Sequence, residues 1–388
     1  MQRKLALVVL AVFMLVMVVG CGGSKSAGTG GGSQEVIKVG FLGALTGDVA
    51  NYGQPGLKGL KMAADELNAK GGILGKKVEI VEADNRGDAT EAANITKKFI
   101  TRDRVSAIIG DPCTGITKVA ANIAQSQKMV LISPGASGEG VCAVGDYIFR
   151  NVTLDEVAAP TVADYVVNKL GKKNVAIITA INDSYSVGLT KYFKDGFTKA
   201  GAQIVGEESI QKGDTDFSAQ VTKLKAKNPD IFVFTGYYTE AALFMQEAAK
   251  QGMKIPFVGG DGCLGADLYK LGGAAVEGSM VYCGFSPEGA TAETQKFLDD
   301  YKVKYKQDAD MFSAQYYDAL MIVAQAMERA KSTDPKVYRA EMAKTKDFPG
   351  VSGVTTFREN REPIKSLVYL LTVKDSSFKL LDKIPVKL

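Results

Sequence analysis

Residues 36–83 read VIKVGFLGALTGDVANYGQPGLKGLKMAADELNAKGGILGKKVEIVEA, in which two apolar, β-branched runs enclose one amphipathic stretch. The stretch from about Pro55 to Ala69 carries apolar residues at three- and four-residue steps, which is typical of a helix, and a Gly-Gly pair after it supplies a stop. The runs at 36–43 and 76–83 have the Val and Ile content of strands. The segment therefore predicts a strand, a helix and a second strand.

The same alternation continues along the chain and predicts an α/β fold of parallel sheets covered by helices. Further strands are expected at 105–110, 129–133, 174–180, 202–208, 230–236, 255–260 and 278–285. Further helices are expected near 155–170, 187–200, 216–227, 240–251, 291–306 and 313–330. About nine strands of the parallel type exceed what one compact open sheet usually holds, so two doubly wound lobes with a cleft between them are predicted. The tail from residue 354 instead predicts antiparallel strands with a turn at Glu359-Asn360-Arg361.

The first 34 residues predict export and a lipid anchor. An unbroken apolar run from Leu5 to Val19 is shorter than the ~20 residues that span a bilayer, which is typical of a secretory signal peptide. The run ends in Val18-Val19-Gly20-Cys21, which resembles the lipobox of bacterial lipoproteins, where the cysteine is acylated and becomes the new N-terminus. Residues 22–34 are rich in Gly and Ser and predict a flexible tether. We therefore expect a signal peptide at 1–20, a lipidated Cys21 and an extracytoplasmic body; the alternative is an ordinary cleavage site with an incidental cysteine.

The composition argues against several classes of function. The chain has 47 Lys and Arg against 43 Asp and Glu, a formal charge of +4 that is too balanced to hold a nucleic-acid backbone. It contains no His, which removes the Ser-His-Asp triad, the Cys-His pair and His-ligated zinc. We predict no nucleic-acid partner, no metal and no other cofactor, and a binding protein rather than an enzyme.

Four cysteines follow Cys21 in the sequence, and they are Cys113, Cys142, Cys263 and Cys283. An even number of cysteines in an oxidising compartment predicts disulfides. Three pairings exist, and the spacing favours Cys113 with Cys142 and Cys263 with Cys283, because each pair brackets one short segment. The alternative is free buried thiols, since spacing does not establish geometry.

Three glycine-rich segments approach known motifs but lack essential parts. Gly260–Gly265 has the GxGxxG spacing, yet Asp261 would set a carboxylate beside a pyrophosphate, and no acidic residue stands about twenty positions further on at a strand end. The segment GGILGKK at 71–77 lacks the spacing and the Ser or Thr of a Walker A loop. Gly135–Glu139 lacks the last glycine of a nucleophile elbow and a His to activate its serine. We therefore predict neither a dinucleotide site nor catalysis.

Polar residues at the C-terminal ends of the predicted strands are the candidate ligand-binding residues, because open α/β sheets bind ligands there. Thr114 follows the third strand and opens a helix, where its hydroxyl and nearby N–H groups would face an anion; the alternative is a helix N-cap. Gly135 and Ser137 follow the fourth strand and would suit a small carboxylate; the alternative is a turn. Asp261 follows the eighth strand and would hold an ammonium group; the alternative is again an N-cap.

Tyrosines fall in the same connections, and they are Tyr52, Tyr185, Tyr237 and Tyr238. Each offers a flat apolar face and a hydroxyl group to a ligand. A single loop tyrosine is more often structural than functional, so the set carries more weight than any member.

The family resemblance is carried by residues 39–84 and then, in order, by VSAIIGDPCTG, VLISPGAS, FVFTGYYTE and IPFVGGDG. In these segments the chain resembles the substrate-binding proteins of branched-chain amino acid ABC transporters, the leucine/isoleucine/valine-binding family of type I periplasmic binding proteins. The resemblance covers the whole body, from about residue 35 to residue 388.

The resemblance implies a two-lobed clamshell that closes on a zwitterionic amino acid and then docks on an ABC permease. The lobes are expected at 35–154 with 285–357 and at 155–284 with 358–388, with hinges near 153–155, 284–286 and 356–361. The family roles fall on Thr114, Gly135 and Ser137 for the α-carboxylate, on Asp261 for the α-ammonium, and on Tyr52, Tyr185 and Tyr237 or Tyr238 for the side chain.

Two departures from the family pattern bear on these expectations. In the family, a cysteine at the position of Cys113 pairs with one in the loop after the second strand, and here that loop, Asp84–Asp88, has no Cys. Asp261 stands where the longer Glu is familiar, which alters the geometry around an ammonium group. We expect a monomer that is attached to the membrane by its lipid anchor and binds a branched-chain or similar aliphatic amino acid. The alternative is another small solute on the same scaffold, such as an aliphatic amide, urea or an aromatic acid.

Overall fold

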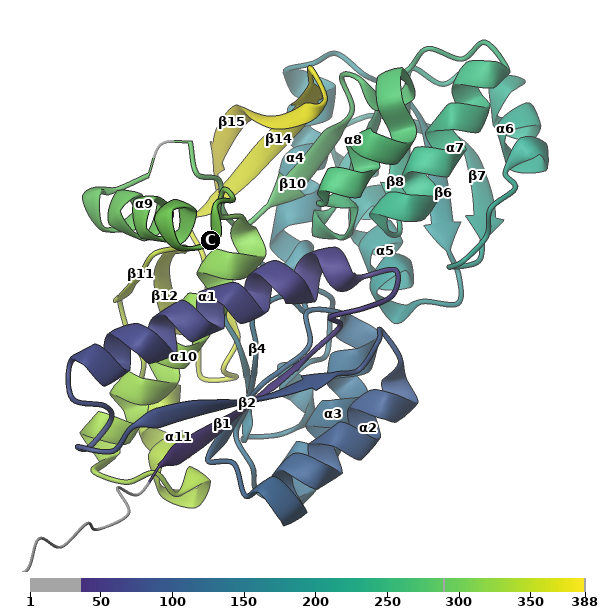
Figure 1. The fold of residues 1–388 in the computed structure, drawn as a ribbon. Coiled ribbons are helices and arrows are strands. Elements are labelled where there is room, and N and C mark those ends of the chain that lie inside the picture. The colour runs from purple at the N-terminus through teal and green to yellow at the C-terminus, as the bar shows by residue number, and fades with distance from the viewer. Residues whose placement is uncertain (1–35, 289, 387–388) are drawn as a thin grey trace, which may run out of the picture. The chain divides into compact units, whose positions relative to one another are not determined.

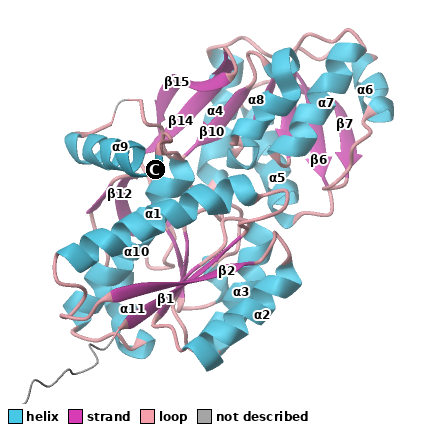
Figure 2. Ribbon diagram, in the orientation of Figure 1, coloured by secondary structure: helices cyan, strands magenta, loops and turns pink. Residues whose placement is uncertain are grey.

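The computed structural model of the protein describes residues 36–288 and 290–386, which form an α/β structure with two main sheets (Figures 1 and 2). The predicted α/β class is therefore confirmed. The signal peptide, Cys21 and the tether fall outside the described residues. Within the described part, no helix is both long and apolar enough to cross a membrane.

The first sheet has five parallel strands in the order β2-β1-β3-β4-β5. The strands are β1 (Ile37–Gly43), β2 (Val78–Asp84), β3 (Ala107–Ile109), β4 (Leu131–Ser133) and β5 (Ile148–Arg150). The helices that accompany it are α1 (Ala50–Ala69), α2 (Ala89–Lys98), α3 (Thr114–Ser126), α9 (Ala292–Tyr305), α10 (Met311–Ala330) and α11 (Pro335–Ala343). Figure 1 shows α1 and α10 on one face of this sheet and α2 and α3 on the other. Both faces are covered, which is why its inner strands β1, β3 and β4 are mostly apolar and buried, whereas the edge strand β2 is only partly buried.

The second sheet has seven strands in the order β15-β14-β10-β9-β8-β6-β7. Its strands are β6 (Asn174–Ala180), β7 (Gln203–Ile210), β8 (Ile231–Thr235), β9 (Phe257–Gly259), β10 (Met280–Cys283), β14 (Leu367–Lys374) and β15 (Ser377–Pro385). Its helices are α4 (Asp155–Asn168), α5 (Ser184–Lys199), α6 (Ser218–Lys225), α7 (Tyr238–Lys250) and α8 (Ala266–Gly272). The parallel part repeats the strand order of the first sheet, so each sheet has one point where the winding reverses, and there the C-terminal ends of the strands form a ligand-binding crevice.

A third, antiparallel sheet contains β11 (Phe348–Gly350), β12 (Gly353–Phe357) and β13 (Pro363–Ile364). Phe357 pairs with Pro363, so the predicted turn at Glu359-Asn360-Arg361 is confirmed. The tail strands β14 and β15 form an antiparallel hairpin on the edge of the second sheet, as predicted. The chain passes between the two main sheets three times, after β5, after β10 and after β13.

Several local predictions were incomplete, and helices α2, α8 and α11 were not predicted. Helix α1 begins at Ala50 rather than near Pro55, because a proline in the early turns of a helix loses only one backbone hydrogen bond, and Pro55 lies inside the helix. Strand β5 was missed, since its three residues are too few to display a period.

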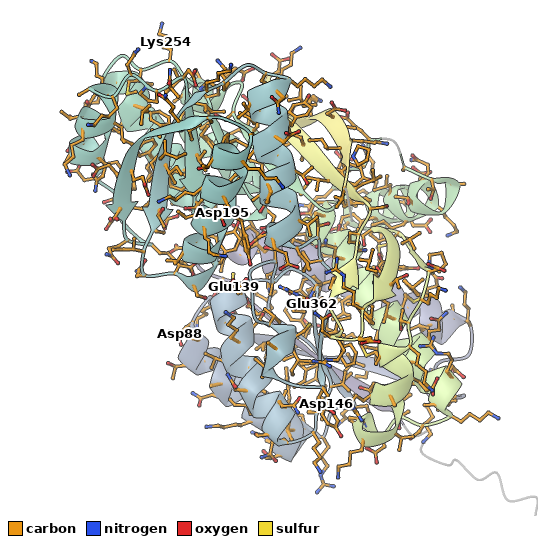
Figure 3. All side chains as sticks on the ribbon, turned by 180° about the vertical axis from the view of Figure 1, so that it is seen from behind. Asp88, Glu139, Asp146, Asp195, Lys254 and Glu362 are labelled. Atoms are coloured by element: carbon orange, nitrogen blue, oxygen red, sulfur yellow. The ribbon has the colours of Figure 1, made fainter. Side chains whose placement is uncertain are left out.

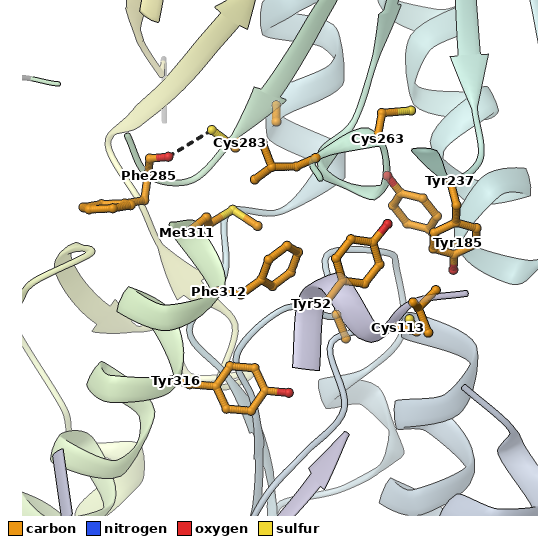
Figure 4. Packing of buried hydrophobic residues seen from close by; sticks show 14 of the residues in the cluster. Tyr52, Cys113, Tyr185, Tyr237, Cys263, Cys283, Phe285, Met311, Phe312 and Tyr316 are labelled. Atoms are coloured by element: carbon orange, nitrogen blue, oxygen red, sulfur yellow. Dashed lines mark hydrogen bonds between the residues drawn. The ribbon is translucent and has the colours of Figure 1, made fainter. Parts of the chain in front are cut away.

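The four cysteines of the described residues are buried free thiols, so both predicted disulfides are wrong. The physical reason is that the sulfur atoms face separate parts of the structure. The Cys142 thiol donates a hydrogen bond to the carbonyl of Arg361 (Sγ to O, 3.6 Å), and the Cys283 thiol donates one to the carbonyl of Phe285 (3.0 Å; Figure 4). Cys263 donates to the carbonyl of Gly236 (3.7 Å), and Cys113 lies at the start of α3.

We expect all four thiols to be protected in the folded body and countable only after unfolding. Burial raises the pKa of Cys142 and of Cys283 to about 12, which suppresses the reactive thiolate. A thiol reagent should label residues 35–388 slowly in buffer and at four sites in denaturant, and dithiothreitol should leave the thermal midpoint unchanged. Fewer than four labelled sites, or a lower midpoint after reduction, would establish a disulfide.

Candidate functional site

A cavity of about 260 Å³ lies where the C-terminal ends of strands from both main sheets meet. Its walls are mostly aromatic and hydroxyl-bearing side chains (Figure 4). The lining residues are Tyr52, Pro112, Cys113, Thr114, Gly135, Ser137, Tyr185, Tyr237, Asp261, Gly262 and Phe312. Seven of the eight predicted ligand-binding residues are therefore brought together at one cavity.

The eighth, Tyr238, lies behind the cavity wall. Its ring packs edge-on against Tyr52 at 5.4 Å between centroids, and its hydroxyl donates a hydrogen bond to the carbonyl of Asp48. Tyr238 therefore supports Tyr52 and does not line the cavity. The lining tyrosines Tyr52 and Tyr185 lie in the first turns of α1 and α5, not in loops as the sequence suggested.

One end of the cavity is built by the loops after β3 and β4. The Thr114 hydroxyl oxygen accepts a hydrogen bond from the Gly138 N–H (3.1 Å), which ties the loop after β4 to the start of α3. The N-cap of α3 is Cys113, so the N-cap alternative for Thr114 is wrong. Gly135 allows the close approach that the sequence suggested, because a Cβ there would stand 2.4 Å from the Cβ of Pro112. The hydroxyl groups of Thr114 and Ser137 and the N–H groups at the start of α3 suit a small carboxylate.

Asp261 occupies the opposite side of this end. It begins a short 3-10 helix, Asp261–Cys263, and α8 is capped by Gly265, so Asp261 is not the N-cap of α8. Its Oδ1 accepts hydrogen bonds from the hydroxyls of Ser137 (3.2 Å) and Tyr185 (3.1 Å). Burial, followed by the charge of Asp155, raises the pKa of Asp261 well above its ordinary value. Within residues 36–288 and 290–386, no Lys or Arg forms an ion pair with Asp261 to compensate the burial of its charge.

Asp155 is a second buried carboxylate at the same end, and the sequence analysis missed it. It is the first residue of α4 and is fully buried. The Tyr282 hydroxyl donates to its Oδ1 (2.7 Å), while its Oδ2 has no hydrogen-bond partner. Burial raises the pKa of Asp155 to about 6. In the sequence it resembles any acidic residue in the first turn of a helix, so no local signal marks it.

The opposite walls of the cavity are aromatic. The rings of Tyr52 and Phe312 lie 4.6 Å apart, and those of Tyr185 and Tyr237 lie 5.6 Å apart. Figure 4 shows these four rings converging from α1, α10 and the second sheet. Phe312 was also missed, because on an apolar helix such as α10 it cannot be told from a core residue. The walls suit an apolar group.

Side chains from the two sets of loops contact one another around the cavity. The Tyr52 hydroxyl donates to the carbonyl of Gly262 (2.6 Å), and the Asn51 amide donates to Asp267 (Nδ2 to Oδ2, 2.8 Å). On another side the Tyr192 hydroxyl donates to Glu139 (3.0 Å). These contacts shield the cavity from solvent.

A tyrosine side chain occupies the space beside the glycine-rich segment Gly260–Gly265. A Cβ at Gly260 would lie 2.6 Å from the Tyr185 hydroxyl, and the Gly262 N–H donates to that hydroxyl (3.0 Å).

Among the described residues, no three His, Cys, Asp or Glu side chains gather in an arrangement that could hold a metal ion.

A family model described as periplasmic binding protein matches residues 36–377. The chain belongs to the periplasmic binding protein family. Within this family, the leucine-specific-binding protein of Salmonella typhimurium is 31% identical over 306 residues, which cover 79% of this chain and 82% of that protein.

Solved structures of this family superimpose on most of the chain. A leucine binding protein of Thermotoga maritima has a TM-score of 0.86 at 32% identity and covers 90% of this chain and 99% of its own. The branched-chain amino acid transporter substrate binding protein of Streptococcus pneumoniae, solved in complex with isoleucine, has a TM-score of 0.84 at 35% identity and covers 91% and 99%. The predicted type I periplasmic binding protein fold and the predicted family are confirmed.

Proposed function

We propose that this protein is an extracytoplasmic, lipid-anchored binding protein that captures a branched-chain or similar aliphatic amino acid and delivers it to an ABC permease. The observation that carries the proposal is Asp261, a buried carboxylate that lines a small cavity with aromatic walls and that feels the charge of a second buried carboxylate, Asp155. A buried carboxylate without a cation is costly, and the α-ammonium group of an amino acid would supply the missing charge.

The remaining contacts follow from the geometry of an amino acid. The α-carboxylate would lie against the hydroxyls of Thr114 and Ser137 and the start of α3. The side chain would lie against the rings of Tyr52, Tyr185, Tyr237 and Phe312, which form the apolar part of the cavity wall.

Capture would proceed by closure of two lobes, 35–154 with 285–357 and 155–284 with 358–388, about hinges near 153–155, 284–286 and 356–361. Because Ser137 and Asp261 follow strands of different sheets, a ligand that contacts both favours the closed arrangement. The lipid anchor at Cys21 would keep the body at the membrane, within reach of the permease.

Calorimetric titration of residues 35–388, unfolded and refolded to remove carried-over ligand, tests the proposal. We expect saturable 1:1 binding of L-leucine, L-isoleucine and L-valine. Two leucine analogues each remove one end of the ligand: 4-methylpentanoate has no ammonium and 3-methylbutylamine has no carboxylate. Each should bind at least about 100-fold more weakly, because a buried charged group is left unpaired. Binding of an aliphatic amide, urea or benzoate in place of leucine would overturn the amino-acid assignment.

A further inference from the structure

Arg150 is the last residue of β5. Its side chain is buried and forms hydrogen bonds with the backbone of the loop after β4. Its guanidinium Nη1 donates to the carbonyl of Ala136 (2.7 Å) and to the carbonyl of Gly138. These two carbonyls flank Ser137, whose hydroxyl lines the cavity and bonds to Asp261. Arg150 itself is not among the cavity-lining residues. It therefore contacts the site through the backbone of the loop, while its charge also lowers the pKa of Asp155, which burial raises.

The other side of the guanidinium faces the segment between β12 and β13. Its Nε donates to the Glu362 carboxylate (Oε2, 2.5 Å), and Figure 3 marks Glu362 near the middle of the body. The same segment is fixed to the first sheet by Arg361, whose Nη2 donates to the carbonyl of Cys142 (2.8 Å) and whose Nε donates to the carbonyl of Ile148 (3.3 Å). Immediately after β13 the chain makes its third passage between the main sheets.

A guanidinium suits this place because it donates in several directions within one plane and stays charged at all accessible pH values. Glu362 is the only carboxylate that forms an ion pair with Arg150 in the described part of the chain, and both side chains are almost fully buried. If one member of such a pair is lost, the other is left as an uncompensated charge. The guanidinium of Arg150, a single rigid group, therefore binds both the two loop carbonyls and the segment between β12 and β13.

We infer that Arg150 is a positioning residue for ligand binding, and that the Arg150–Glu362 pair links the position of Ser137 to the segment from which the chain passes to the second lobe. This inference rests on the proposed function. A ligand that orders the loop at residues 135–138 thereby also fixes one of the three connections between the lobes. Loss of the pair should loosen the loop and weaken binding, although neither residue touches the ligand.

The test compares Glu362→Gln and Arg150→Lys with Lys365→Met as the matched control. Gln keeps the shape of Glu362 without its charge, and Lys keeps a charge without the planar fork. Lys365 is a buried charge just after β13 that donates to the Thr355 hydroxyl (2.7 Å). None of its hydrogen bonds in the described part of the chain reaches the loop after β4, so its loss measures destabilisation of this region alone. Leucine affinity, the ligand-free thermal midpoint and amide hydrogen exchange at residues 135–138 are measured for each protein.

We expect Glu362→Gln and Arg150→Lys to weaken leucine binding about tenfold or more and to speed amide exchange at residues 135–138, with Lys365→Met staying within about twofold of the wild type in both. Unchanged exchange in Glu362→Gln, or equal effects in the control, would overturn the inference. Amide exchange is measured without ligand, so this result stands even if the wild type binds no leucine, an outcome that would refute the proposed function instead.

Discussion

Asp261→Asn is expected to weaken L-leucine binding by about 100- to 1000-fold. Asp261 is 6% exposed, and the hydrogen bonds to its Oδ1 come from the neutral hydroxyls of Ser137 and Tyr185, so its charge is available to a ligand ammonium group. Asparagine keeps the shape but presents no charge, which leaves the ammonium buried without its main partner. The cost is about 3 to 4 kcal/mol, which corresponds to this loss of affinity. Titration calorimetry at pH 8 measures it directly.

The same substitution is expected to stabilise the ligand-free protein, which separates loss of a ligand contact from general damage. Asp155 and Asp261 are both buried, and the charge of Asp155 raises the pKa of Asp261. Loss of the Asp261 charge therefore removes its desolvation cost and its repulsion with Asp155. Glu240→Gln is the matched control, because Glu240 is a buried carboxylate outside the cavity with an unpartnered Oε2. It should leave leucine affinity unchanged. Leucine binding by Asp261→Asn at the wild-type affinity would show that Asp261 does not hold the ammonium group.

Much of this architecture could be predicted from the sequence. The two signals used, the residue pattern of each element and the residue types at the strand ends, are both local in the chain. The alternation of β-branched runs with amphipathic stretches arises because both faces of a parallel sheet are covered. It located every parallel strand except β5 and most of the helices, but not α2, α8 or α11. The ligand-binding candidates followed from one topological rule, that such sheets bind ligands at the ends of their strands. Thr114, Ser137 and Asp261 obey it and lie at one cavity.

The residues that escaped prediction owe their roles to tertiary contacts. Asp155 and Phe312 stand in the first turns of helices with ordinary acidic or amphipathic character. Only tertiary packing brings Phe312 to the cavity and the charge of Asp155 close enough to act on Asp261. The disulfide prediction failed for a related reason. Sequence spacing gives no sulfur-to-sulfur distance, and the cysteines at 113 and 142 face different neighbours.

Leucine binding is expected to weaken about tenfold or more as the pH falls from 7 to 5. An ammonium group binds to ionised carboxylates, whereas burial raises the pKa of Asp155 to about 6 and the pKa of Asp261 well above its ordinary value. Below these values a proton competes with the ligand, and each displaced proton costs about tenfold in affinity per pH unit. Calorimetric titrations at half-unit steps of pH follow the change.

The contribution of these two carboxylates to the stability of the ligand-free protein should instead rise as the pH falls. This contrast with the affinity for leucine identifies the carboxylates as the cause. Groups with raised pKa values bind protons more tightly in the folded state, so their contribution to the free energy of unfolding is lost as the pH rises through the folded pKa and regained as it falls. Other carboxylates also titrate, and the difference between the wild type and Asp155→Asn isolates this pair. In that variant Asp261 no longer faces a second carboxylate, so the loss of leucine binding should move to lower pH. An affinity that is flat between pH 5 and 7, or an identical profile in Asp155→Asn, would mean that the two buried carboxylates do not together receive the ligand's ammonium group.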